Sequence, residues 1–169
     1  MEKIELSKLE RLTLANQFRI LAALGEGDVA THNANAEILL GGHTVYYSSV
    51  FKELGAEVPD KVTTELWDIL DMFYATSQVL RDHPNETAGF DRKKLTFQGF
   101  DAEHEAYAEQ ARFLVEHMNR FEELKGGRFT STSQDDMRRY RRMLPIFKMA
   151  FSSPAGVTPE TLRTMQEAG

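Results

Sequence analysis

The strongest fold signal in the chain is residues 94–124, which read KLTFQGFDAEHEAYAEQARFLVEHMNRFEEL. A short extended segment, residues 96–100, comes first, and Asp101 follows it as a predicted N-cap. Apolar residues then recur at spacings of four, three, four and three, the pattern of one helical face; they are Tyr107, Ala111, Leu114, Met118 and Phe121. We expect a long amphipathic helix from Asp101 to Leu124 at the centre of the fold. We also expect the Phe97 and Phe100 rings to be buried, with Gly99 in a turn between them.

A helix near the N-terminus is predicted between Ser7 and Gly25. Ser7 and Glu10 form an S-x-x-E capping box, and glycine is a common helix stop. This helix is apolar almost all round, which is typical of a helix buried on several sides, in a domain or between subunits. Asn16 and Gln17 lie among its apolar positions. If those positions are buried, both amides need hydrogen-bond partners, from neighbouring backbone or from a ligand.

The remaining pattern is also helical. We expect short helices over residues 33–40 and 44–54, separated by Gly41 and Gly42, and a longer helix over residues 61–80. Ser133 is the predicted cap of a helix that contains Pro145, which should bend it. Residues 158–160, Thr-Pro-Glu, start a last helix. The predicted fold is all-α, a single compact domain over residues 1–169 with five to seven helices.

Composition excludes several classes of site. The chain has no cysteine, which excludes disulfides, thiolate metal sites and cysteine nucleophiles. Residues 1–5 contain no signal-peptide core, and no apolar run approaches membrane-spanning length, so we expect a soluble cytoplasmic protein without a membrane partner. The net charge of −6 argues against a general nucleic-acid binder.

No known catalytic motif is present in the sequence. It contains no phosphate-binding glycine loop, no H-E-x-x-H and no nucleophile elbow. His104 and His117 are 13 residues apart, so on one helix they point about 140° apart and do not share a metal ion. We therefore expect no metal and no cofactor. The polar residues best placed to line a ligand pocket are Asn16, Gln17, Asp101, His104, Tyr140 and Arg142.

Charge is unevenly distributed over two predicted helices. Residues 101–123 contain seven acids and two arginines, whereas residues 137–151 contain four arginines, one lysine and no acid. Because each set lies opposite an apolar stripe, we expect two outward patches of opposite sign. Three interpretations stay open. The patches pair between molecules, they are two solvated faces screened by salt, or the arginine patch binds nucleic acid.

Several stretches together resemble the YfbU-like family of uncharacterised bacterial and archaeal proteins. The resemblance spans nearly the whole chain and rests on LANQFR (residues 14–19), ILDMFY (69–74), LTFQGFD (95–101), RF (112–113 and 120–121) and YRRML (140–144). Pro145 departs from the family pattern. Some relatives resemble fusions to a helix-turn-helix domain, which implies a ligand-binding or regulatory role. This chain shows no such extension, so its regulatory output is expected to need a separate partner.

These observations leave two functional hypotheses open. The first is a small-molecule-sensing or protein-interaction regulatory domain that forms a homo-oligomer through its apolar first helix. The second is an enzyme of unrecognised type with a polar pocket. A closed cavity with converging polar groups and a perturbed carboxylate favours the enzyme, and a flat apolar patch on the first helix favours the interaction domain.

Overall fold

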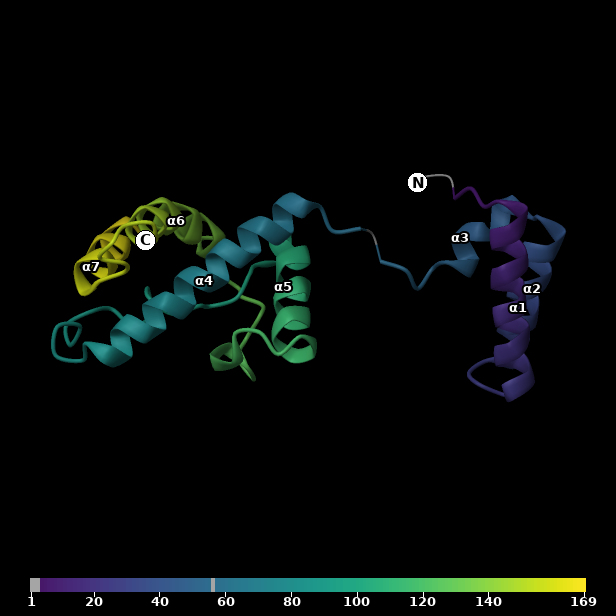
Figure 1. The fold of residues 1–169 in the computed structure, drawn as a ribbon, viewed down its shortest axis with the longest axis horizontal. Helices are drawn as coiled ribbons and strands as arrows, with labels where there is room; N and C mark the ends of the chain where they lie inside the picture. Colours follow the sequence, from purple (N-terminus) through teal and green to yellow (C-terminus); the bar gives the residue numbers. More distant parts are fainter. Residues whose placement is uncertain (1–3, 56) are drawn as a thin grey trace. The chain divides into compact units, whose positions relative to one another are not determined.

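The computed structural model describes residues 4–55 and 57–169 (Figure 1). Within these residues seven α-helices form and no strand does, which confirms the all-α prediction. The chain divides into two compact units, unit 1 (Met1–Glu57) and unit 2 (Val58–Gly169). The expectation of one domain over residues 1–169 stays a prediction.

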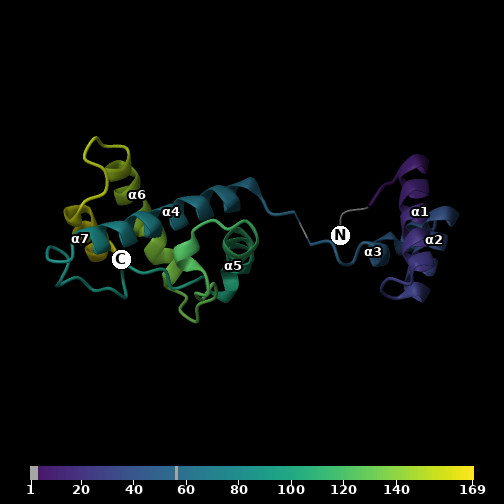
Figure 2. The same cartoon turned by 60° about the horizontal axis from the view of Figure 1, so that its bottom comes forward.

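Unit 1 is built on two helices that lie side by side, α1 (Lys8–Leu24) and α2 (Val29–Gly41) (Figures 1 and 2). The predicted capping box at Ser7 is present, and Gly25 ends α1 with a φ of +71°. α2 begins earlier than predicted because the Asp28 carboxylate accepts the backbone N–H groups of Ala30 and Thr31. The predicted helix over residues 44–54 is shorter, a 3₁₀ turn η1 (Thr44–Tyr46) followed by α3 (Tyr47–Val50).

The first helix buries only one side within unit 1. The fully buried apolar residues of this unit are Ala15, Ala36, Leu39, Tyr47 and Val50. Leu14 and Phe18 pack partly against them, but Leu9, Leu12, Ile20 and Leu24 are exposed. Asn16 and Gln17 are exposed as well, so neither amide needs a protein partner.

Unit 2 is organised around its longest helix, α4 (Asp60–Asp82), and not around residues 101–124. α5 (Glu105–Arg112), α6 (Asp136–Phe151) and α7 (Pro159–Ala168) all pack against α4 (Figures 1 and 2). Two short 3₁₀ turns, η2 (Ala102–His104) and η4 (Glu122–Leu124), complete the unit, together with a π-helix, η3 (Phe113–His117).

The predicted long helix from Asp101 to Leu124 is wrong. The helical run starts with the 3₁₀ turn η2, continues through α5 and the π-helix, and ends at His117. Tyr107, Ala111 and Leu114 are buried as the apolar pattern requires, but Met118 is exposed. The early end follows from the backbone, because Asn119 and Phe121 adopt left-handed conformations that no α-helix accommodates.

The segment before α5 matches its predicted role more closely. Phe100 is fully buried and Phe97 is partly buried against the same core. Gly99 has a φ of +91°, and the backbone N–H of Phe100 donates to the carbonyl of Phe129 at 2.9 Å. The Asp101 side chain caps the first turn, as predicted, by accepting the backbone N–H of Glu103 at 2.9 Å.

α6 differs from the sequence prediction at its start and in its charges. Ser133 is not its cap, because the chain turns once more before the helix begins at Asp136. Pro145 lies inside a helix that continues to Phe151. The predicted outward basic patch is wrong for Arg139, which is buried. Arg141 and Lys148 are exposed as predicted, and they pair with Glu65 and Asp68 of α4.

Candidate functional site

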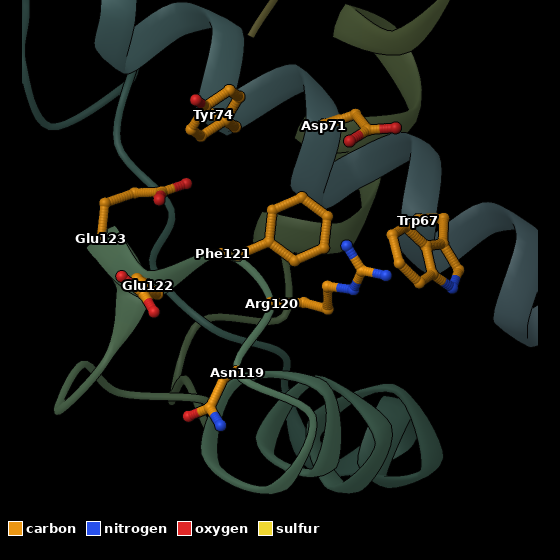
Figure 3. Close-up of a pocket in the computed structure, with 8 residues that line it drawn as sticks. All are labelled: Trp67, Asp71, Tyr74, Asn119, Arg120, Phe121, Glu122 and Glu123. Carbon is orange, nitrogen blue, oxygen red and sulfur yellow. The ribbon is translucent and has the colours of Figure 1, made fainter.

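A surface cavity in unit 2 lies between α4 and the segment that follows the π-helix (Figure 3). Its volume is about 400 Å³, within the range of small-molecule sites. Its lining residues are Trp67, Asp71, Tyr74, Asn119, Arg120, Phe121, Glu122 and Glu123. We define this cavity as the aromatic–acidic pocket.

One wall of the pocket comes from regular helix geometry. Trp67, Asp71 and Tyr74 are four and three residues apart on α4, so they lie on one face of that helix. The opposite side of α4 carries buried residues such as Ile69 and Phe73. The core therefore fixes α4 in place, with Asp71 and Tyr74 exposed and Trp67 partly buried against the edge of the core.

The other wall comes from an irregular backbone. Residues 113–117 form a π-turn, in which the Met118 N–H donates to the Phe113 carbonyl at 3.1 Å. Asn119 and Phe121 then have φ values of +50° and +53°. Such conformations cost about 1–3 kcal/mol each for non-glycine residues and cluster, like π-turns, at functional sites.

This irregular backbone sets the position of one aromatic ring. The Phe121 ring faces α4 and lies 5.3 Å from the Trp67 ring, measured between centroids (Figure 3). The Arg120 guanidinium lies near the same two rings (Figure 3). Two rings from separate segments thus form an apolar surface, with Tyr74 further along α4 as a third.

The charges around the pocket are mostly negative. Three of its lining residues are acids, Asp71, Glu122 and Glu123, and one is a base, Arg120. Burial raises the pKa of Asp71, and the neighbouring Asp68 raises it further. A carboxylate that is partly desolvated and next to another acid gains most from a cation, so the pocket favours a positively charged group beside its rings.

A second cavity of about 560 Å³ adjoins the first, because Asp71 and Tyr74 line both. Its other lining residues are more apolar: Ala75, Gln78, Val79, Asp82, His83, Phe151, Gly156 and Val157. Because Asp71 and Tyr74 belong to both cavities, a ligand bound at Asp71 can contact apolar surface in each of them.

The structure separates the six residues that the sequence suggested as ligand contacts. Asn16 and Gln17 are exposed on α1 of unit 1, and the other four belong to unit 2. Asp101 and His104 come together, with the His104 Nδ1 atom 2.8 Å from an Asp101 carboxylate oxygen. Burial raises the pKa of Asp101, but the hydrogen bonds from His104 and from the Glu103 N–H outweigh it and lower that pKa.

The other two suggested residues have structural partners. The buried Tyr140 hydroxyl accepts the Gln98 N–H at 2.9 Å and donates to the Gly99 carbonyl at 3.0 Å. Arg142 donates to the carbonyl of Ala168 near the end of α7 at 2.7 Å. None of the six residues lines either cavity, and their role as ligand contacts stays a prediction.

Sequence reasoning missed the pocket because it read Phe121 as part of a helix face. The motif ILDMFY supplies Asp71 and Tyr74, and the motif RF at 120–121 supplies the facing residues. Their meeting depends on the π-turn and on two left-handed residues, which no spacing in the sequence announces. In the part of the chain that the structure describes, no three His, Asp or Glu side chains are grouped to hold a metal ion. No helix among those residues is long and apolar enough to cross a membrane.

Both walls of the pocket are thus made by stretches that carry the family resemblance. The model of the YfbU domain matches residues 4–159 of the 169 residues. This match covers all of unit 1 that the structure describes and α4, α5 and α6 of unit 2. The chain belongs to the YfbU domain family.

Proposed function

We propose that the protein is a small-molecule-binding regulatory domain, and that its ligand is a small organic amine with an aromatic or apolar body. The observation that carries the proposal is the aromatic–acidic pocket, which Trp67, Tyr74 and Phe121 line together with Asp71, an acid whose pKa is raised by partial burial. The ammonium group pairs with Asp71 and with the faces of the rings, an arrangement worth about 0.5–2 kcal/mol per cation–ring contact. The apolar body lies toward the second cavity.

The regulatory part of the proposal rests on the backbone at the pocket. Asn119 and Phe121 hold left-handed conformations, and both line the cavity. A ligand that contacts Phe121 shifts the equilibrium between the left-handed conformation and a relaxed conformation. The size of this shift is set by the difference in the ligand's affinity for the two conformations. The surface around residues 118–124 is then the part that signals occupancy to a protein partner. Cytoplasmic location and the alternative of an enzyme stay predictions from the sequence.

The protein provides its own probe for this test, since Trp67 is its single tryptophan. We expect phenethylamine, an aromatic amine, to change Trp67 fluorescence saturably and to raise the melting temperature. Phenylacetate has the same ring with the opposite charge and should do neither. Asp71→Asn should weaken phenethylamine binding at least tenfold, which corresponds to about 1.4 kcal/mol.

Asp60→Asn is the matched control, because Asp60 is an exposed aspartate of the same helix that lines neither of the two cavities. It should bind phenethylamine like the unchanged protein. Equal responses to phenethylamine and phenylacetate, or an Asp71→Asn variant that binds normally, would contradict the proposal.

A further inference from the structure

The outward side of α1 is an apolar surface with nothing in unit 1 to cover it. Leu9 is 73% exposed, Ile20 58% and Leu24 69%, and Leu12 is also exposed. Leu9, Ile20 and Leu24 lie about 120–180° around the helix from Ala15, which packs on α2, and Leu12 lies on the flank between the two sides. An exposed apolar helix face is typical of an interaction site and not of a solvated surface.

The residues of this face are arranged symmetrically about Asn16. Asn16 is the middle residue of α1, with eight helical residues on either side. Leu12 and Ile20 are four residues away from it, and Leu9 and Ala23 are seven residues away. By helix geometry all four lie within about 40° of Asn16, whereas the nearest charged residue on the helix lies about 60° away. We call Leu9, Leu12, Asn16, Ile20 and Ala23 the α1 face.

Unit 1 needs additional burial to be stable. Its fully buried core has five residues, two of them alanines. A chain of about 60 residues is already marginal with a normal core, and small folds commonly gain the missing burial by oligomerisation. The α1 face is an exposed apolar surface of unit 1 that such an association can cover.

The area of the α1 face fits a two-fold contact. The apolar members of the α1 face, Leu9, Leu12, Ile20 and Ala23, are all exposed and present about 400 Å² of apolar area per copy. Two copies then bury about 800 Å², and the polar flanks bring the total to the roughly 1,000 Å² at which specific interfaces begin. This is the size at which weak or transient interfaces are found.

We propose that the α1 face binds the α1 face of a second copy of this chain, with the two Asn16 amides hydrogen-bonded to each other at the two-fold axis. A two-fold interface uses the same patch on both copies, so the residue at its centre meets its own counterpart. An Asn side chain has both a donor and an acceptor, so two of them satisfy each other. A single polar residue in an apolar helix pair also fixes the register and the number of helices, at a cost in stability.

Cross-linking tests the centre of the interface directly. The chain has no cysteine, so Asn16→Cys introduces a single thiol. Two cysteines form a disulfide when their Cα atoms are about 4.4–6.8 Å apart, which holds only next to the axis. We expect the oxidised Asn16→Cys protein to become a covalent dimer. Val45→Cys, on an exposed apolar residue of the same unit, should stay mostly uncrosslinked.

Sedimentation of the full chain tests the energetics. The unchanged protein should dimerise between about 1 and 100 μM, the range of a micromolar dissociation constant. Ile20→Glu should weaken dimerisation at least tenfold with an unchanged helical circular dichroism signal, and Val45→Glu should leave it unchanged. Asn16→Leu should tighten association at least tenfold or raise the number of copies in the oligomer. The substitution removes the free-energy cost of burying the polar Asn16 side chain.

Two outcomes would overturn the proposal. One is a protein that stays monomeric up to about 100 μM and whose Asn16→Cys variant oxidises no faster than Val45→Cys. The other is a dimer that Ile20→Glu and Asn16→Leu leave unchanged, which would place the interface elsewhere.

Discussion

Units 1 and 2 differ in how completely each buries its own apolar residues. Among the described residues, the core cluster of unit 1 has five buried members and that of unit 2 has 21. Unit 1 leaves a whole side of its longest helix exposed, whereas α4 of unit 2 is covered by three other helices. Unit 2 therefore buries enough apolar surface for a self-sufficient fold, whereas unit 1 leaves one side of its longest helix unburied.

The two units also differ in how far along the chain their polar contacts reach. The helix caps of unit 1, at Ser7 and Asp28, join residues two or three positions apart. In unit 2 the Glu65 carboxylate on α4 accepts the Tyr107 hydroxyl of α5 at 2.5 Å and the Arg141 guanidinium of α6 at 2.8 Å. Contacts that span 42 and 76 residues tie separate helices together, so unit 2 should unfold cooperatively.

The largest expected effect is that of Gly99→Ala. The new Cβ atom would lie 2.8 Å from the carbonyl carbons of Phe129 and Thr130, at a φ of +91°. The left-handed backbone and the clash together should destabilise unit 2 by about 3 kcal/mol in urea unfolding. Gly89→Ala is the control, since a Cβ there meets open space. Loss of the helical signals of both units together at lower urea would show that the units do not unfold independently. It would contradict the difference in stability that their burial implies.

The second effect concerns the buried Tyr140 hydroxyl. Tyr140→Phe leaves the Gln98 N–H and the Gly99 carbonyl without the partner that now bonds both. Loss of these buried hydrogen bonds should cost about 2 kcal/mol in the free energy of unfolding. Tyr46→Phe in unit 1 is the matched control, because Tyr46 is exposed and should change little. Equal effects of the two substitutions would mean that the Tyr140 contacts do not stabilise unit 2.

The sequence predicted helices well where the signal was local. The capping box at Ser7, the stop at Gly25 and the start at Thr158 depend on residues within one turn, and all three are present. The predictions failed where distant contacts decide. The sequence did not show that Arg141 and Lys148 of α6 pair with Glu65 and Asp68, because these partners are 76 and 80 residues away.

The pocket likewise depends on distant contacts that the sequence did not reveal. The spacing of Trp67, Asp71 and Tyr74 on one helical face is readable from the sequence, but that spacing alone does not distinguish a pocket wall from the flank of a core helix. What makes them a site is the left-handed backbone at Phe121, which places its ring against Trp67. A strained conformation is held by the surrounding packing, so local sequence does not reveal it.

A third effect compares helix caps in the two units. Ser7→Ala and Asp101→Ala each remove a side chain that accepts a backbone N–H, and each should cost about 1 kcal/mol in urea unfolding. Asp101→Asn keeps the accepting oxygen and should retain most of the stability. If Asp101→Ala melts like the unchanged protein and loses a ligand or partner, Asp101 is functional and its capping role is secondary.

The smallest expected effect is a change in how the free energy of unfolding depends on pH. The hydrogen bond from Arg141 lowers the pKa of Glu65 below its ordinary 4.5, and the Tyr107 hydroxyl and the charges of Arg141 and Lys61 add to this against partial burial. The unfolded chain therefore takes up the Glu65 proton at a higher pH than the folded chain does. The stabilisation from Glu65 is complete above about pH 4.5 and is lost as the pH falls through the lower, folded value.

Glu65→Gln should consequently reduce the fall in unfolding free energy below about pH 4.5, by about 1 kcal/mol or less for a partly exposed pair. The neutral variant should also be less stable than the unchanged protein at pH 7, so the two curves converge toward acid. Glu109→Gln, on the exposed side of α5, should follow the unchanged protein throughout. Because Glu65 ties α4 to α5 and α6, the convergence should appear in the unfolding of unit 2. Parallel curves for Glu65→Gln and the unchanged protein would show that the Glu65 contacts add no net stability to that unit.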